Sequence, residues 1–150
     1  MFEKILLGIV FVGILCVISL IDIYKRIIPD SLLIIAVVFR IGYCVFVERI
    51  GVKAILGLLI DGLAISLPVF ILVLLVEKIW KKEVLGGGDI KFLFVTGIYL
   101  GWEGNLLALF FACIMGIVIG MVQMKREEKD IYFPFGPAIA LGAVCAMLIG

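Results

Sequence analysis

The sequence predicts an all-α membrane protein in which six transmembrane helices form a single domain over residues 1–150. The first observation behind this is composition: 65% of the 150 residues are hydrophobic and the mean hydropathy is +1.36. About half of the residues of a soluble domain are apolar. The second is that the apolar residues form long runs separated by short charged or turn segments. Because one span takes about 20 apolar residues, the chain holds about six spans and leaves no room for a soluble domain.

The expected helices cover residues 5–24, 31–47, 54–76, 90–101, 105–124 and 133–149. The first apolar run also has the position of a signal peptide, but no small-residue cleavage site precedes the charged residues that follow it. We therefore expect it to be retained as the first span. The fourth segment is short for a span, unless it tilts or continues through Trp102.

Lysine and arginine in the connections predict the orientation, because cytoplasmic loops carry an excess of these residues. Most of the 13 fall on one side of the expected bundle: Lys25, Arg26, Lys78, Lys81, Lys82, Lys91, Lys125, Arg126 and Lys129. The others fall on the opposite side: Lys4, Arg40, Arg49 and Lys53. The richer side is expected to be cytoplasmic, so both termini are expected to be extracytoplasmic.

Composition also excludes several classes of function. The net charge of +1 comes from short clusters that form no basic face, so we expect no nucleic-acid partner. Histidine, the commonest general base and metal ligand, is absent from the sequence. The four cysteines occur singly without a CxxC pair, which argues against a zinc ribbon and predicts buried apolar residues: Cys16, Cys44, Cys113 and Cys145. We expect neither a metal nor a cofactor.

Four aspartates lie within or at the edge of an expected span, where insertion scales put the cost at roughly 2.5–3.5 kcal/mol at a helix centre. They are Asp22, Asp30, Asp61 and Asp89. Asp30 follows Pro29 at the start of a helix, and helix capping is its favoured explanation. Asp61 lies inside the outer end of the third helix, which favours hydrogen bonding between helices.

Asp89 is delivered to the start of an apolar segment by three glycines, Gly86, Gly87 and Gly88. Glycines adopt positive φ angles and let a backbone or a substrate approach closely. Asp89 is expected in the first turn of the fourth helix, where the helix dipole favours a carboxylate. A glycine loop with a helix-capping aspartate is the alternative explanation.

Asp22 lies at the inner end of the first helix, and two further helices separate it from Asp89. An even number of crossings returns the chain to the same side, so both carboxyls are expected at one depth. Two close carboxyls share a proton, and one then acts as base to a water while the other donates to a carbonyl oxygen. This is aspartic peptidase chemistry, which needs neither histidine nor metal. Alternatively, Asp22 pairs with Lys25 or Arg26 at the membrane surface.

Three motifs in this order resemble the type IV prepilin peptidase family. They are Asp22 followed by the segment from Lys25 to Asp30, then Gly86-Gly87-Gly88-Asp89-Ile90-Lys91, and then Pro134-Phe135-Gly136-Pro137. The members are GxGD membrane aspartic proteases, a group that includes the archaeal preflagellin peptidases and, more distantly, presenilin. The resemblance covers nearly the whole chain.

The resemblance implies that Asp22 and Asp89 are catalytic and that Gly86, Gly87 and Gly88 support the loop or contact the substrate. The resemblance also implies that Lys91 contacts the substrate. An equally good explanation of Lys91 is that its side chain extends to the inner membrane surface and places its charge there. Pro134, Phe135, Gly136 and Pro137 are expected to order the chain near the site. The implied substrate is a prepilin-like membrane protein with a short basic leader in the cytoplasm, cut between this leader and its apolar helix.

One departure from the larger family members is that they carry an N-terminal domain with paired CxxC motifs, associated with methylation of the new N-terminus. This sequence has no CxxC. It therefore resembles the minimal peptidase form, as in the archaeal enzymes and the short peptidases of tight-adherence pilus systems, and methyltransferase activity is not expected. The expected location is the plasma membrane, with the active site on the cytoplasmic side.

The competing class is a non-enzymatic membrane protein, either a small transporter or an assembly subunit of a secretion or pilus system. In such a protein, Asp22 and Asp89 would line an ion path. A transporter more often places its acidic residues near the middle of the bilayer, whereas these two are expected at one surface.

Overall fold

The computed structural model describes residues 2–49, 51–81, 85–125 and 135–149. Its elements are α1 (Phe2–Lys25), α2 (Asp30–Phe46), α3 (Val52–Trp80), α4 (Gly87–Lys125) and α5 (Phe135–Ile149). No strand occurs within these ranges, which confirms the all-α class. Among the residues discussed above, Lys82, Arg126, Lys129 and Pro134 lie outside the described ranges.

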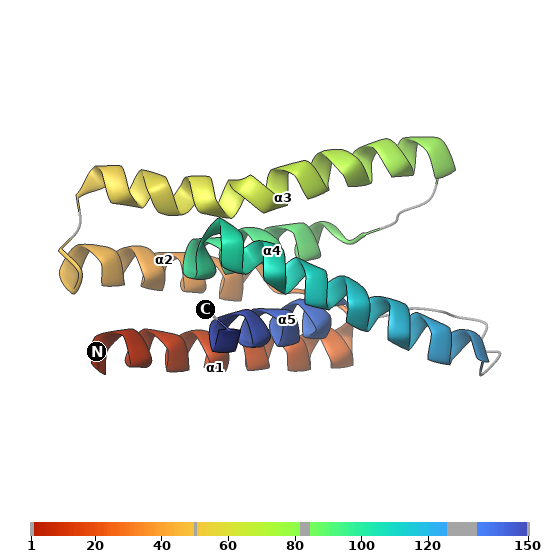
Figure 1. Cartoon of the computed structure of the whole chain (residues 1–150), viewed down its shortest axis with the longest axis horizontal. Coiled ribbons are helices and arrows are strands. Elements are labelled where there is room, and N and C mark those ends of the chain that lie inside the picture. Colours follow the sequence, from red (N-terminus) through yellow and green to blue (C-terminus); the bar gives the residue numbers. More distant parts are fainter. Residues whose placement is uncertain (1, 50, 82–84, 126–134, 150) are drawn as a thin grey trace.

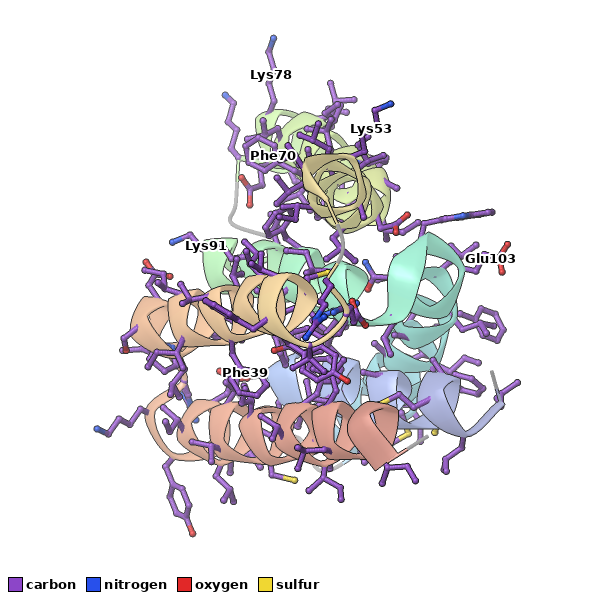
Figure 2. All side chains as sticks on the ribbon, turned by 90° about the vertical axis from the view of Figure 1, so that its left-hand side faces the viewer. Phe39, Lys53, Phe70, Lys78, Lys91 and Glu103 are labelled. Carbon is purple, nitrogen blue, oxygen red and sulfur yellow. The ribbon has the colours of Figure 1, made fainter. Side chains whose placement is uncertain are left out.

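The helices form three layers (Figure 1). α3 lies along one side, α1 and α5 lie antiparallel along the other, and α2 lies between them with the first part of α4. α4 is the central element, because it contacts α2, α3 and α5. Figure 2 shows the same layers end on, with Lys53 and Lys78 extending from α3 away from the other helices.

α4 contains both the fourth and the fifth expected helices, joined at Gly101. This residue has φ 73° and ψ 171°, outside the helical region, and the chain reverses direction there (Figure 1). Only glycine adopts such a backbone conformation without strain. A buried network ties the two parts together: Thr96 donates to the Asn105 side-chain oxygen at 2.7 Å, and the Asn105 amide donates to the Leu93 carbonyl at 2.9 Å.

The connections before α2 and after α3 explain where the helices end. Arg26 has φ 56°, which takes the chain out of α1, and the extended Pro29 leads into α2. α3 continues beyond its expected end at residue 76, to Trp80, and stops where Lys81 adopts the left-handed conformation. At 29 residues and 1.5 Å per residue, α3 is about 43 Å long, more than the hydrocarbon core requires.

The buried core joins α1, α4 and α5. It includes Phe11 and Ile18 of α1, Phe92 and Leu93 of α4, and Ile139 of α5, each at most 1% exposed. Small residues of α5, among them Ala143 and Ala146, are also buried in this core. This core fixes the position of α5 relative to the C-terminal part of α1, where Asp22 lies.

The outer surface is strongly apolar, as expected for a membrane protein. Three helical segments in the described ranges are long and apolar enough to cross a bilayer: Ile5–Lys25, Val52–Trp80 and Gly87–Val118. Phe135–Ile149 is a shorter apolar helix.

The prediction that the four cysteines are buried is wrong for three of them. Cys44 is buried, but Cys16 and Cys113 are exposed and Cys145 is only partly buried. The physical reason is the solvent: a small apolar group gains little by leaving lipid for the protein interior, so burial is not favoured as it is in water.

Candidate active site

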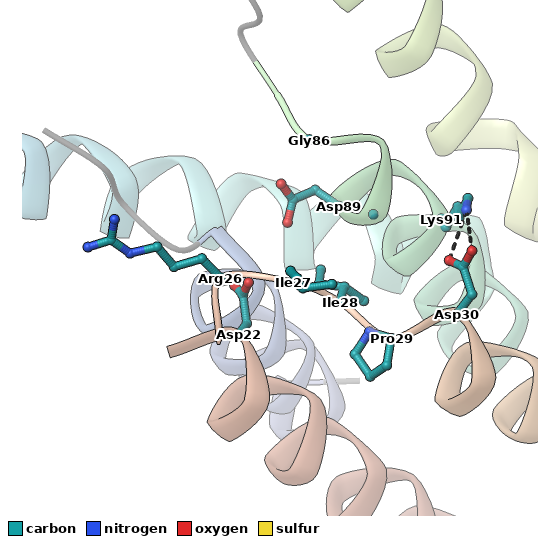
Figure 3. Close-up of a pocket in the computed structure, with 10 residues that line it drawn as sticks. Asp22, Arg26, Ile27, Ile28, Pro29, Asp30, Gly86, Asp89 and Lys91 are labelled. Carbon is teal, nitrogen blue, oxygen red and sulfur yellow. Dashed lines mark hydrogen bonds and ion pairs between the residues drawn. The ribbon is translucent and has the colours of Figure 1, made fainter. Parts of the chain in front are cut away.

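Asp22 and Asp89 line one cavity of about 410 Å³, which we call the dyad cavity. Figure 3 shows the two carboxyls on opposite walls of this space, Asp22 from the last turns of α1 and Asp89 from the first turn of α4. The other lining residues come from the α1–α2 connection and from the start of α4: Arg26, Ile27, Ile28, Pro29, Asp30, Gly86, Gly88 and Lys91. The structure thus brings together the two aspartates that the helix count placed at one depth.

Asp22 is almost fully buried, at 4% exposed, and is held by the start of α5. The Gly136 main-chain N–H donates a hydrogen bond to Asp22 Oδ2 at 3.0 Å. A side chain at position 136 is not compatible with this contact, because a Cβ atom there would lie 2.6 Å from the same oxygen. Of the neighbouring motif residues, Phe135 packs against the core, and Pro137 lines an apolar cavity between α1 and α5. Gly136 therefore touches a candidate catalytic residue directly.

Asp89 is held mainly through its main chain. Its N–H donates to the Gly86 carbonyl at 3.0 Å, which forms the turn that starts α4. Its carboxyl also accepts from the Gly86 main-chain N–H just before α4, as a helix-capping aspartate does, so the capping explanation stands beside the catalytic one. The carboxyl is partly buried and close enough to Asp22 for the two charges to interact.

The glycines before Asp89 act by lacking a side chain and not by adopting positive φ. Among the described glycines, only Gly101 has a positive φ angle, so Gly86, Gly87 and Gly88 do not use the conformational freedom that glycine offers. A Cβ at Gly88 would lie 3.1 Å from Ile28 Cβ, and one at Gly86 would lie 3.3 Å from Asp89 Oδ2. Gly87 is exposed, with nothing within 4 Å of an added Cβ, and leaves open space beside Asp89.

Asp30 does not cap α2, contrary to expectation. The N-cap residue is Pro29, which has no side chain able to cap, and Asp30 lies in the first helical turn. Its carboxylate instead accepts hydrogen bonds from Lys91 Nζ at 2.8 Å to each oxygen (Figure 3). Both side chains are about 60% exposed, and such surface pairs typically contribute 0–1 kcal/mol. The pair joins α2 to α4 at the rim of the dyad cavity without locking them.

Asp61 is separate from this site. It lies in α3, is partly buried and does not line the dyad cavity. The hydrogen bond between helices that was expected for its side chain is not found within the described residues. The described part of the chain also contains no group of three or more histidine, cysteine, aspartate or glutamate side chains that could hold a metal ion.

Sequence reasoning missed two contributors to the site. The Gly136 amide was expected only to order the chain nearby, and nothing in the local sequence indicated that it bonds Asp22, 114 residues away. Ile28, at 8% exposed, packs against Gly88 and so joins the α1–α2 connection to the start of α4. The one feature of the sequence that could have indicated burial of Ile28 was its apolar side chain between the charged Arg26 and Asp30.

Comparisons with known proteins agree on one family. The model of the type IV leader peptidase family matches residues 9–121. A protein of Bacillus subtilis (strain 168) named prepilin leader peptidase/N-methyltransferase is 31% identical over 145 residues, which cover 95% of this chain and 55% of the relative. Proteins with the same name from Stutzerimonas stutzeri and Legionella pneumophila are 29% and 27% identical, over 88% and 98% of this chain.

These relatives are longer proteins. The matches cover 45% of the Stutzerimonas stutzeri protein and 51% of the Legionella pneumophila protein, so this chain spans about half the length of the curated relatives it matches. The two activities in their name are therefore properties of the longer proteins. No solved structure matches the chain.

Proposed function

This chain belongs to the type IV leader peptidase family, and we propose that it is a membrane aspartic endopeptidase with Asp22 and Asp89 as its catalytic residues. Its substrate is a prepilin-like membrane protein, from which it removes the short leader. The observation that carries the proposal is that two aspartates from different helices line one cavity at the ends of those helices. The methyltransferase activity named for the longer relatives is not part of the proposal.

The proposed reaction uses the two carboxyls as an acid and a base. One carboxylate takes a proton from a water molecule as the water oxygen attacks the scissile carbonyl carbon, while the other carboxyl donates its proton to the carbonyl oxygen. The tetrahedral intermediate then collapses, the C–N bond breaks and the leaving nitrogen takes up a proton. The products are the leader with a new carboxylate and the apolar segment with a new amino group.

The surrounding residues support this chemistry in different ways. The Gly136 N–H keeps Asp22 at a fixed place on the cavity wall. Gly86 and Gly88 allow close packing of Asp89 and Ile28, and the open space at Gly87 lets an extended substrate segment approach the dyad. Lys91 is a candidate for contacting the substrate, because it lines the cavity. Its ion pair with Asp30 is exposed and therefore weak, so the ammonium group is available to a substrate.

The topology that fits this function has six spans, both termini outside the cytoplasm and the dyad cavity at the cytoplasmic surface of the plasma membrane. The reversal at Gly101 supports it, because α4 then crosses twice. The cations that line the dyad cavity, Arg26 and Lys91, agree with a cytoplasmic surface. A prepilin-like substrate would present the junction between its leader and its apolar helix at this depth.

Co-expression with a prepilin-like substrate tests the proposal. We expect wild type to shorten the substrate by the length of its leader, and Asp22→Asn and Asp89→Asn each to leave it uncut while still inserting into the membrane. A transporter or assembly subunit would leave the substrate at full length even in the wild-type cells. If both single variants still shortened it, the two-aspartate mechanism would be wrong.

A further inference from the structure

Three cavities meet at Lys91. The first is the dyad cavity. The second, of about 380 Å³, is an apolar groove between α2 and α4 that shares both Asp30 and Lys91 with the dyad cavity. We call it the α2–α4 groove, and its remaining lining residues are Leu33, Ile34, Val37, Val38, Phe94 and Val95. The third, of about 220 Å³, lies between α3 and α4 and shares only Lys91 with the dyad cavity.

We propose that the α2–α4 groove binds the apolar helix of the substrate, on the C-terminal side of the bond that is cut. The inference rests on the proposed function and adds to it where the membrane-embedded half of the substrate lies. The leader and the scissile peptide then lie in the dyad cavity, with the scissile peptide between Asp22 and Asp89. The residues that follow the cut pass the Asp30–Lys91 pair, where the two cavities meet, and enter the groove.

The change in polarity along this path matches the substrate. Among the residues that the structure describes, three aspartates and two cations line the dyad cavity, whereas the only charged ones that line the α2–α4 groove are Asp30 and Lys91. A chain that passes from one cavity to the other therefore goes from a charged to an apolar environment within a few residues. The junction between a polar leader and an apolar helix has the same change of polarity, in the same order.

The shape of the groove suits one face of a helix. Its α2 wall is formed by residues spaced three and four apart, and its two outermost side chains, Ile34 and Val38, are 62% and 64% exposed. A volume of about 380 Å³ accommodates a few side chains of an approaching helix, which pack between the ridges of α2 and α4. The groove between α3 and α4 is smaller and lacks Asp30, so it offers less continuity with the dyad.

The Asp30–Lys91 pair lies where the groove and the dyad cavity meet, because both residues line both cavities. Figure 3 shows this pair beside the dyad cavity. Figure 2 shows Lys91 reaching outward from the start of α4, on the side between α2 and α3. Because the pair is exposed and contributes little, the arriving backbone is able to displace it. The boundary is therefore one that a substrate crosses without a large rearrangement of the helices.

A pair of tryptophan variants on α2 tests the inference. Val38→Trp fills the groove, and Ile35→Trp is the matched control, because Ile35 is 57% exposed on the same helix but does not line the groove. With a full-length prepilin in proteoliposomes, we expect Val38→Trp to raise KM about tenfold and Ile35→Trp to leave it near the wild-type value. With a peptide that contains the leader and only the first residues after the cut, we expect all three proteins to have equal kcat/KM.

Photocrosslinking locates the occupant directly. A benzophenone side chain at position 38 is expected to crosslink an uncleavable prepilin through its apolar helix, and the same side chain at position 35 is not. Equal crosslinking at both positions, crosslinking of lipid alone at position 38, or equal loss of activity toward both substrates in Val38→Trp would overturn the inference. If Asp22→Asn and Asp89→Asn still cut the peptide, the proposed function itself fails, so the two failures are distinguishable.

Discussion

Replacing Gly136 with alanine would displace the Asp22 carboxyl from its position in the dyad cavity. The added Cβ would lie 2.6 Å from Asp22 Oδ2 and 3.1 Å from Asp22 Cγ, whereas ordinary contacts begin at 3.4 Å. The oxygen must therefore move by about 0.8 Å, and a misplacement of about 1 Å costs on the order of a hundredfold in rate. We expect kcat to fall between about tenfold and a hundredfold.

The assay compares Gly136→Ala with Gly13→Ala in proteoliposomes that contain a prepilin substrate. Gly13 is also helical, but nothing lies within 4 Å of an added Cβ, so its replacement is expected to leave the rate unchanged. Thermal unfolding of both variants in detergent controls for loss of structure. A Gly136→Ala protein that folds and cleaves at the rate of Gly13→Ala would refute the contact between Gly136 and Asp22 as a requirement for catalysis.

Two further substitutions test the packing around the site. Gly88→Ala places a Cβ 3.1 Å from Ile28 Cβ and should lower the free energy of unfolding by about 1–3 kcal/mol, whereas Gly87→Ala, with nothing within 4 Å of the added Cβ, should not lower it. Equal stability of the two variants would contradict the contact between Gly88 and Ile28. Asn105→Ala removes one of the two acceptors of the buried Thr96 hydroxyl, the other being the Leu93 carbonyl, and also removes a donor to that carbonyl. It should lower the free energy of unfolding by about 0.5–1.5 kcal/mol. An unchanged melting temperature for Asn105→Ala would show that this network does not hold the two parts of α4 together.

The helices, and the meeting of the two aspartates at one cavity, were predictable from the sequence. In a membrane, every backbone polar group must be paired within the chain, so long apolar runs are strongly constrained to be helices. Counting the runs between Asp22 and Asp89 then places both residues on one side. The reversal at Gly101 left a weaker signal, since the sequence showed a break near Trp102 but not that the two helices would join directly.

The contacts between distant segments were not predictable in this way. The bond from the Gly136 amide to Asp22 depends on how α5 packs against α1, which no local pattern encodes. For the same reason, local reasoning assigned Asp30 to helix capping, although its actual partner, Lys91, lies 61 residues away. Capping and turn preferences depend on neighbouring residues in one segment, whereas the Asp22 and Asp30 side chains are bound by residues of a different helix.

The catalytic role of the two aspartates is tested most directly by mass spectrometry of a prepilin after incubation with the purified chain in proteoliposomes. The account predicts a single cut between leader and apolar helix, which is lost in Asp22→Asn and in Asp89→Asn. It also predicts that Asp61→Asn retains the cut, because Asp61 does not line the dyad cavity. Retention of the cut in either Asp22→Asn or Asp89→Asn would contradict the claim that these two carboxyls carry out the reaction.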